Sequence, residues 1–226
     1  MKILSIDTSV SQVLSLAVSN NSDIIKEEKI VFLEDLSSEI VPRIEKLLRE
    51  ANLSFNLIDG FALDIGPGSF TGLRIGLSCI KAFSFATGKP LVGVSSLDIL
   101  ALGVANLLQT CSVIDAKREN VYSCLYVNKN NQLKATTPYF LTSIDCLLRR
   151  IRKKTLFVGD ALHLYRDKII RSKREISYFA EEKLWYPRIE NLVKLAYARF
   201  KNGQFDDVKS IVPVYLYPQE CQIKKV

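Results

Sequence analysis

The residues from Asp64 to Gly76 could bind a phosphate group. This stretch, DIGPGSFTGLRIG, holds four glycines, one proline, two hydroxyl side chains and one arginine. Glycines let backbone N–H groups approach an anion closely, and the N-terminus of a following helix favours negative charge. The alternative is a tight turn that begins a helix, with Ser69 or Thr71 as the N-cap. The first interpretation is typical of a nucleotide-binding enzyme, and the second suits an accessory protein.

The glycine spacing fits neither of two common nucleotide-binding patterns. The P-loop pattern G-x-x-x-x-G-K-[ST] requires a glycine where Thr71 or Leu73 stands. The dinucleotide pattern G-x-G-x-x-G requires its third glycine at Thr71 as well. What remains is a strand end, a Gly66-Pro67-Gly68 turn and a capped helix. Two interpretations of residues Ser69 to Gly72 remain: a general anion-binding site, or simple capping of the helix N-terminus.

Two aspartates end apolar strands at related places in the chain. Asp7 and Asp115 are 108 positions apart. The same offset relates further identical pairs: Ile6 and Ile114, Val13 and Val121, Ser15 and Ser123, and Asn20 and Asn128. A repeat at half the chain length predicts two related α/β halves, residues 1–108 and 109–226, with the tail packing back on the first half. Chance similarity between two hairpins is the alternative.

A strand, an aspartate, a turn and a second strand open each half, as in the actin, sugar-kinase and Hsp70 superfamily. We therefore expect an α/β fold of the actin-like (ASKHA) type, each half with a mixed sheet flanked by helices. In that superfamily the two hairpins hold the phosphates and metal of ATP. Here the first turn, Thr8-Ser9-Val10, lacks glycine, and Lys117 and Arg118 occupy the second. A phosphate cradle needs small residues, so a degenerate one is expected.

Few residues are available for metal or triad chemistry. His163 is the only histidine, and the five cysteines form no C-x-x-C pair. A histidine or thiolate zinc site is therefore not expected. A Ser-His-Asp triad would depend on His163, in a segment that is typical of a helix, and a packing or surface role is the expected one. We predict no catalytic and no metal-binding residue.

Hydrophobic periodicity predicts alternating strands and helices. The expected strands are 2–9, 12–20, 23–32, 59–65, 89–96, 134–141 and 155–160, with a second hairpin over 113–129. The expected helices are 36–52, 72–87, 97–108, 143–152 and 189–203. The helix over 36–52 is expected to begin at Ser37 or Ser38 and to bury one face.

The helix over 72–87 is apolar nearly all round, with only Arg74 and Lys81 charged. One side carries Leu73, Leu77, Ile80 and Phe83, and the other carries Ile75, Ala82, Phe85 and Ala86. Gly72 and Gly76 are four residues apart and allow a neighbour to come close. Such a helix must be covered on both sides. The second cover is either a helix of the same chain or another subunit.

The net charge of +7 comes largely from the second half. Basic clusters lie at residues 149–154 and 166–175. They could bind nucleic-acid phosphates or form a solvated basic face. No aromatic residues are interleaved in a stacking pattern, which argues against direct reading of bases.

The first residues and the cysteines bear on the compartment. The N-terminus MKILSIDTSV turns polar too early for a signal peptide, and no apolar run is long enough to span a bilayer. The cysteines are odd in number and scattered, which favours reduced thiols. We therefore expect a cytoplasmic protein without a membrane partner.

Five stretches across essentially the whole chain resemble the TsaB family, also called YeaZ. They are ILSIDTS, DIGPGSFTGLRIG, PLVGVSSLDILA, VIDAKRENVY and PVYL. Within them GPGSFTGLRIG is highly specific. The fourth stretch matches the second family signature through Asp115, Glu119, Val121 and Tyr122.

The chain departs from the family pattern in a few places. Leu36-Ser37 stands where many relatives have His-Thr or His-Ser, so any role of that histidine does not carry over. Lys117 and Tyr217 stand where arginine is usual. These two changes indicate local variation in surface contacts.

The resemblance implies an actin-like fold and a non-catalytic, accessory role. The process is the threonylcarbamoyl modification of the adenosine beside the anticodon in tRNAs that read codons beginning with A. A TsaD-type catalytic subunit is the implied partner, joined by a TsaE-type ATPase. No intrinsic cofactor is expected, with ATP or ADP bound at the interface of the complex. We also expect a homodimer when the chain is alone, and tRNA contact through the basic surface.

The resemblance places the partner contact on the helices over 36–51 and 72–87. The expected interface residues are Ile40, Ile44, Leu47, Leu48, Gly72, Leu73, Ile75, Gly76, Cys79, Ile80 and Phe83. The family-motif residues, which are also the candidates for an anion or nucleotide contact, are Asp7, Thr8, Ser9, Gly66, Pro67, Gly68, Ser69, Thr71, Arg74 and Asp115.

Two other functions remain as alternatives. The chain could be an actin-superfamily ATPase or small-molecule kinase acting alone through Asp7 and Asp115. It could also be an RNA-binding module in its own right, which predicts salt-sensitive tRNA binding that depends on Arg149, Arg150 and Lys153.

Overall fold

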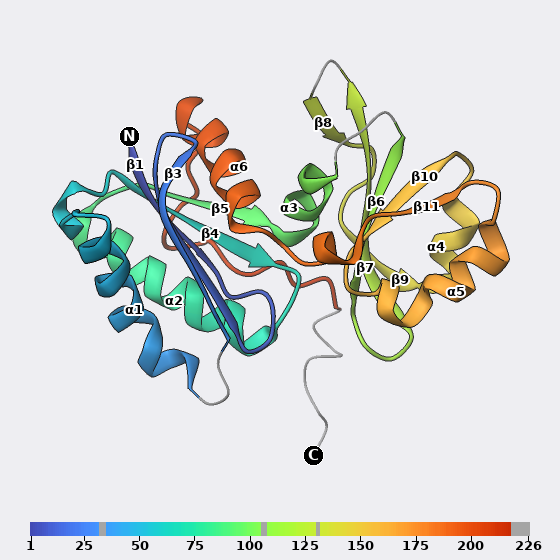
Figure 1. Ribbon diagram of the computed structural model, residues 1–226, viewed down its shortest axis with the longest axis horizontal. Coiled ribbons are helices and arrows are strands. Elements are labelled where there is room, and N and C mark those ends of the chain that lie inside the picture. Colours follow the sequence, from blue (N-terminus) through green and yellow to red (C-terminus); the bar gives the residue numbers. More distant parts are fainter. Residues whose placement is uncertain (32–34, 105–107, 130–131, 218–226) are drawn as a thin grey trace. The chain divides into compact units, whose positions relative to one another are not determined.

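A computed structural model describes residues 1–31, 35–104, 108–129 and 132–217 of the chain. The chain divides into two compact units. The first comprises Met1–Ile99 and Pro187–Val214, and the second comprises Leu100–Tyr186 and the residues from Tyr215. The predicted boundary between residues 108 and 109 differs from this division. The second unit begins earlier, at Leu100, and residues 187–214 lie with the first unit. The expected two α/β units with mixed sheets are confirmed (Figure 1).

The first unit is built on a five-stranded sheet in the order β3-β2-β1-β4-β5. Its strands are β1 (Lys2–Asp7), β2 (Val13–Asn20), β3 (Asp23–Val31), β4 (Gly60–Gly66) and β5 (Leu91–Ser95). β1, β4 and β5 run parallel, while β2 and β3 are antiparallel to their neighbours. The central strands are buried on both faces and read as continuous apolar runs, whereas the edge strand β3 alternates.

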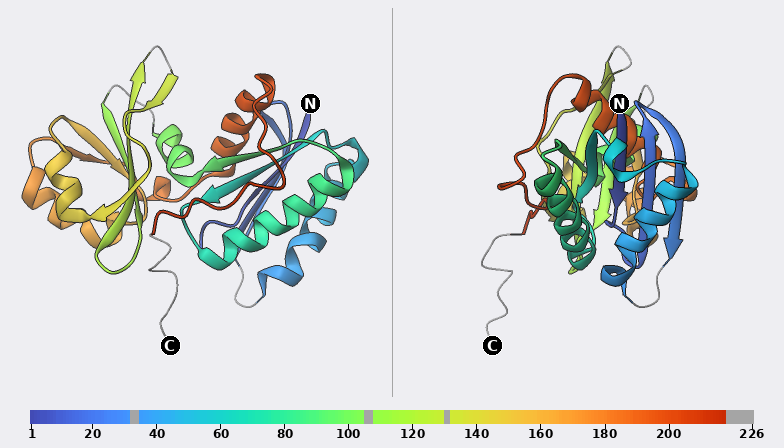
Figure 2. Two further views of the ribbon diagram at one scale, coloured as in Figure 1. Left: turned by 180° about the vertical axis from the view of Figure 1, so that it is seen from behind. Right: turned by 90° about the vertical axis from the view of Figure 1, so that its left-hand side faces the viewer.

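Helices cover both faces of this sheet (Figures 1 and 2). α1 (Leu36–Glu50) and α2 (Phe70–Thr87) pack on one face, where Leu4 and Ile6 point. α6 (Ile189–Lys201) packs on the other, where Ile3 points. Because side chains alternate along a strand, β1 supplies both cores. A short 3₁₀ turn, Phe55–Leu57, precedes β4, and α3 (Ser96–Gly103) follows β5.

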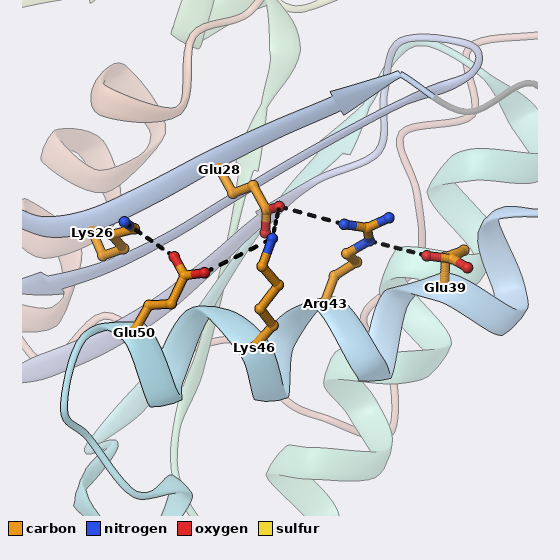
Figure 3. Close-up of polar contacts among 6 residues, drawn as sticks. All are labelled: Lys26, Glu28, Glu39, Arg43, Lys46 and Glu50. Carbon is orange, nitrogen blue, oxygen red and sulfur yellow. Dashed lines mark hydrogen bonds and ion pairs between the residues drawn. The ribbon is translucent and has the colours of Figure 1, made fainter.

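A network of charged side chains ties α1 to the edge strand β3. The network comprises Lys26, Glu28, Glu39, Arg43, Lys46 and Glu50 (Figure 3). Glu28 on β3 is central, with Arg43 Nη1 at 3.5 Å and Lys46 Nζ at 3.2 Å from its Oε1. Exposed pairs of this kind each contribute little to stability, about 0–1 kcal/mol. The side of α1 that lies against the sheet is set by its buried apolar residues, and the ion pairs flank that contact.

The second unit has a six-stranded sheet. Its strands are β6 (Gln109–Asp115), β7 (Asn120–Lys129), β8 (Gln132–Ala135), β9 (Phe140–Ser143), β10 (Thr155–Val158) and β11 (Ser177–Phe179). The order is β11-β10-β6-β7-β8, and β9 also pairs with β7. α4 (Ile144–Arg150) and α5 (Leu162–Lys173) lie side by side, and a 3₁₀ turn, Glu182–Leu184, follows β11 (Figure 1). Among the described residues no helix is long and apolar enough to cross a bilayer.

The two repeated hairpins differ in register by two residues. Asp7 pairs with Ser15, whereas Asp115 pairs with Val121, the counterpart of Val13. The turn of the second hairpin is correspondingly shorter. An even shift keeps every side chain on its original face of the sheet, so the sequence repeat survives the change.

Several predicted element boundaries need correction. The strand expected at 134–141 is two strands, β8 and β9, because residues 136–139 form a bend between them. The N-cap of α1 is Asp35, whose carboxylate accepts from the Ser37 N–H, and not Ser37 or Ser38. The short strand β11 was not predicted. The helix expected at 97–108 ends at Gly103 as α3, and residues 105–107 are outside the described residues. Residue 32, the predicted end of the strand over 23–32, is also outside them.

Candidate functional site

The loop after β1 is held by the glycine turn that begins α2. The Ser69 N–H donates to the Ser9 carbonyl oxygen at 2.7 Å. A Cβ added at Gly68 would overlap that same carbonyl, and one added at Gly72 would overlap the carbonyl oxygen of Thr8. Glycine is therefore required because the two backbones approach so closely.

Gly76 has the same role one turn further along α2. A Cβ there would overlap the Thr8 hydroxyl oxygen. Gly72 and Gly76 are both buried within the first unit. Their predicted role at a subunit interface is corrected accordingly: they admit the β1 loop of their own chain.

The start of α2 is capped by its own residues. Gly66 has φ of +93°, and the Gly66–Pro67 peptide bond is cis. The Ser69 hydroxyl oxygen accepts from the Gly72 N–H at 3.3 Å, as expected for an N-cap. Two N–H groups of the proposed anion site, those of Ser69 and Gly72, are thus bonded inside the chain. Pro67 is buried, and Thr71 is exposed beside this turn.

Asp7 ends β1, and Asp64 lies two residues before the end of the adjacent parallel strand β4. Their side chains are 4% and 1% exposed. Asp7 Oδ1 accepts from the Ser9 N–H at 2.8 Å. Asp64 Oδ1 accepts from the Gly66 N–H at 2.7 Å and from the Ser96 hydroxyl at 2.6 Å. Each carboxyl group therefore anchors the turn that follows its own strand.

Burial favours the neutral form of both acids. Desolvation raises the pKa of Asp7, against the lowering effect of the Ser9 N–H. Desolvation, reinforced by the charge of Asp7, raises the pKa of Asp64 well above its usual range. Asp64 Oδ2 and the Ser9 hydroxyl are buried without a hydrogen-bond partner among the described residues. An enclosed carboxyl group with a raised pKa is poorly suited to hold a metal ion.

Asp64 is a key residue that the sequence did not single out. It lies near the end of an otherwise apolar strand and has a glycine two positions later. An aspartate that bonds the backbone two residues on is a common turn device, so this spacing was the available signal. Its proximity to Asp7 depends on the pairing of β1 with β4, which no local pattern encodes.

The turn after Asp115 is closed by its own side chains. Asp115 accepts from the Lys117 N–H at 3.0 Å and pairs with Lys117 Nζ at 2.6 Å. Its own N–H donates to Asp160 Oδ1 at 2.9 Å, and burial raises the pKa of Asp160. Lys117, Arg118 and Glu119 all have positive φ, between 52° and 61°. This left-handed turn without glycine has no open phosphate cradle.

Tyr217 fastens this second turn. Its hydroxyl donates to the Ala116 carbonyl oxygen at 2.8 Å, and its ring meets Tyr122 edge-on. The residue that departs from the family's usual arginine therefore has a defined structural contact.

His163 lies on α5 in an aromatic cluster. Its Nε2 is 3.1 Å from the Tyr186 hydroxyl, and its ring meets the Trp185 ring edge-on at 4.8 Å. These contacts fit the expected packing role of this histidine.

Most residues predicted for the partner interface lie in the core of the first unit. Six apolar side chains are only 0–4% exposed: Ile40, Ile44, Leu47, Leu48, Leu73 and Ile80. These side chains are buried between the helices and the sheet of their own unit. They are therefore not available as a docking surface in this fold, and the prediction for them is corrected. Ile75, Cys79 and Phe83 are half-buried against the same core, and burial raises the pKa of the Cys79 thiol to about 11.

The outward face of α2 is the exposed part of the predicted docking region. It consists of Phe70, Thr71, Arg74, Ser78, Ala82, Phe85 and Ala86. Phe70 is 50% exposed and Phe85 is 73% exposed. The guanidinium of Arg74 stacks on the Phe70 ring at 3.8 Å. Arg74 is the one charged residue on this face, which is unusual for a solvated helix.

Comparison with known structures first defines the class of fold. A sugar-kinase relative, the ROK hexokinase from Thermus thermophilus, matches with a TM-score of 0.51 at 10% identity, covering 90% of this chain and all of the other. YeaZ from Pseudomonas aeruginosa matches with a TM-score of 0.79 at 23% identity, covering 95% of this chain and 99% of the other. The fold is therefore of the actin-like type.

Residues 32–225 match the family model described as TsaD, tRNA N6-adenosine threonylcarbamoyltransferase, and the chain belongs to that family. Its near full-length relatives carry the name tRNA threonylcarbamoyladenosine biosynthesis protein TsaB. The protein from Bacillus subtilis is 29% identical over 99% of this chain and 97% of its own length. The one from Escherichia coli is 25% identical over 96% and 94%. The resemblance to TsaB is confirmed.

Proposed function

We propose that this chain acts in tRNA threonylcarbamoyladenosine biosynthesis as a non-catalytic partner of a TsaD-type subunit. The names of its full-length relatives support the process. The observation that carries the partner role is the outward face of α2, where Phe85 is 73% exposed and Arg74 is the one charge. An apolar helix face of this kind is stabilised by a covering surface.

This proposal moves the interface from the buried to the exposed side of α2. The docking surface is the outward face together with its half-buried border, Ile75, Cys79 and Phe83. α1 contributes its exposed side, on which Val41 is 41% exposed. The buried glycines and leucines support this surface from beneath.

The strand-end acids support a non-catalytic role. Asp7 is enclosed and its pKa is raised, and Asp115 is paired with Lys117. In the described part of the chain no three His, Cys, Asp or Glu side chains lie close enough together to hold a metal ion. A nucleotide site completed only in the complex, for ATP or ADP, agrees with this arrangement.

The remaining partners follow from the same assignment. We expect a TsaE-type ATPase to join the complex in the cytoplasm, and the chain alone to form a homodimer through the outward face of α2. A closed dimer would cover Phe85 by its own copy. Size-exclusion chromatography of the Phe85→Asp variant tests the homodimer, with a monomer as the expected result.

A capture experiment tests the partner role. The full chain with Phe85→Asp is compared with the native chain for co-purification with the TsaD-type subunit. Leu164→Asp is the matched control, because Leu164 is also an exposed apolar helix residue, at 63%, but lies on α5 of the second unit. A charge at the centre of an apolar contact should weaken capture at least about tenfold.

Two outcomes decide the experiment. Loss of capture in Phe85→Asp with retention in Leu164→Asp supports the outward face of α2 as the interface. Equal capture by both variants, with unchanged circular dichroism, contradicts it. Magnesium-dependent ATP turnover by the isolated chain that disappears in Asp7→Ala would contradict the non-catalytic role instead.

A further inference from the structure

Almost all the excess charge of the protein is concentrated in residues 145–175. This segment contains ten Lys and Arg residues and four Asp and Glu residues, a net charge of +6. The whole chain has a net charge of +7. The other residues sum to a net charge close to zero, so this segment supplies most of the net attraction to a polyanion.

The fold brings two separate basic stretches to one edge of the second sheet. β10 and β11 are parallel neighbours, with Thr155 opposite Ser177. The Thr155 N–H donates to the Ile176 carbonyl oxygen at 2.7 Å. The residues just before β10 and those just before β11 are thus side by side, although they are about twenty positions apart in sequence.

The helices reinforce this convergence. α4 leads into β10 and α5 leads into β11, so both helices end at the edge where these strands begin (Figure 1). α4 carries Arg149 and Arg150 in its last turn, and α5 carries Arg171 and Lys173. Both helix C-termini and both following loops therefore present cations at the same place.

Three of the ten cations already have partners. Arg150 stacks on the Phe140 ring at 4.7 Å, Arg166 lies over the Phe179 ring at 5.3 Å, and Lys168 pairs with Asp145 at 2.8 Å. The other seven have no ion pair within residues 132–217, which the structure describes throughout. We call these seven the basic edge: Arg149, Arg152, Lys153, Lys154, Arg171, Lys173 and Arg174.

Helix stabilisation accounts for only part of the basic edge. Cations in the last turn of a helix interact favourably with its dipole, which suits Arg149, Arg171 and Lys173. Arg152, Lys153 and Lys154 lie beyond the end of α4 and are exposed. Three adjacent like charges in a loop repel one another, so a bound polyanion is the arrangement that would stabilise them.

We propose that the basic edge binds the sugar-phosphate backbone of tRNA. The choice of tRNA rests on the proposed function. The charge of the seven side chains, of which all but the half-buried Lys173 are exposed, indicates phosphate as the group recognised. Lys and Arg side chains make most phosphate contacts, and without interleaved aromatic residues the basic edge offers no platform on which bases could stack. Binding is therefore expected to be sensitive to salt and tolerant of tRNA sequence.

The test is tRNA binding by the full chain at several salt concentrations. The variant Arg152→Gln/Lys153→Gln/Lys154→Gln changes only loop residues whose side chains have no ion pair in the structure. The control Lys194→Gln/Lys201→Gln/Lys209→Gln removes the same charge from exposed positions of the first unit. The loop variant should show a salt slope shallower by about 2 to 3, at about 0.7–0.9 per lost phosphate contact. The control should keep the native slope.

Three results would overturn the proposal. They are a native slope and affinity in the loop variant, an equal loss in the control, and preferential binding of the native chain to phosphatidylglycerol vesicles over tRNA. Capture of the TsaD-type subunit is measured with the same two variants. If both variants still capture the TsaD-type subunit and the loop variant binds tRNA like the native chain, the proposed tRNA contact is refuted and the partner role stands. If capture fails in the native chain, the partner role is refuted, and the salt slopes still decide the basic edge.

Discussion

The two strand-end turns of this protein use the same starting pattern in different ways. After Asp7 the chain is buried beneath the glycine turn of α2, and its backbone is bonded to a distant segment. After Asp115 the chain turns back at once through three exposed residues with positive φ. The first turn is held by long-range contacts, and the second mainly by itself and by Tyr217.

This difference shows how a nucleotide-type hairpin can be kept for structural purposes. In both units the aspartate accepts from the backbone N–H two residues later. Neither turn combines glycines with an open anion-binding concavity. Gly68, Gly72 and Gly76 instead lie where α2 meets the first turn. Changes at the first turn should therefore affect the whole unit, and changes at the second should remain local.

The largest expected effect is at the contact between α2 and the first turn. Gly72→Ala places a methyl group against the Thr8 carbonyl oxygen. We expect the free energy of unfolding to fall by about 1–3 kcal/mol, even though alanine favours helix. Urea denaturation measures this change. Ser78→Ala, on the exposed side of the same helix, is the control and should stay within about 0.5 kcal/mol. Equal stability of the two variants would contradict the close packing.

The next effect is a dependence on pH at the first turn. The pKa of Asp64 is raised in the folded state, so folding favours its protonated form. Its contribution to stability is therefore greatest below the unfolded pKa and is lost as pH rises through the folded pKa. Asp64→Asn mimics the neutral acid and should lose less stability than the native chain as the pH rises above the ordinary pKa of aspartate.

Asp115→Asn serves as the comparison for this pH series. It lies in the turn whose aspartate pairs with Lys117, and it should leave the pH dependence of the first unit unchanged. A native pH dependence in Asp64→Asn would show that the buried acid does not govern it.

A smaller effect is expected where Tyr217 fastens the second turn. Tyr217→Phe removes the hydrogen bond to the Ala116 carbonyl oxygen but keeps the ring contact with Tyr122. We expect a loss of about 0.5–1.5 kcal/mol. Hydrogen exchange should report faster exchange at residues 116–120 and no change near Thr8. A global increase in exchange would mean that the second turn is not a local element.

The smallest effect is expected at Lys117. Its side chain is 84% exposed, so its ion pair with Asp115 is screened by water. Lys117→Gln should change the free energy of unfolding by less than about 1 kcal/mol. A larger loss would show that this ion pair contributes strongly to the stability of the second turn. The proposed difference between the turns after Asp7 and Asp115 would then be wrong.

Local patterns in the sequence predicted most of the elements but not their neighbours. The alternation of Leu14, Leu16 and Val18 marked a strand, and Ser69 was one of the two predicted candidates for the helix cap that it forms. The buried face of α1 was also predicted from its periodicity. Periodicity shows that a face is covered, but it does not show what covers it. For this reason Ile40 and Ile44 were assigned to a partner when their own sheet covers them.

Contacts between distant segments were beyond the reach of such patterns. The need for Gly72 depends on Thr8, and the raised pKa of Asp64 depends on its burial and on Asp7 in the neighbouring strand. Both depend on the parallel pairing of β1 with β4, which is set by the whole fold. The convergence of the basic edge likewise follows from the pairing of β10 with β11.

The central claim is that this chain supports threonylcarbamoylation of tRNA by a TsaD-type subunit without carrying out the chemistry. Reconstitution of the modification from purified components, with the chain present, absent or replaced by Phe85→Asp, tests this claim most directly. We predict that modification requires the native chain, falls sharply with Phe85→Asp, and is unaffected by Leu164→Asp. Full modification in the absence of the chain would contradict the claim.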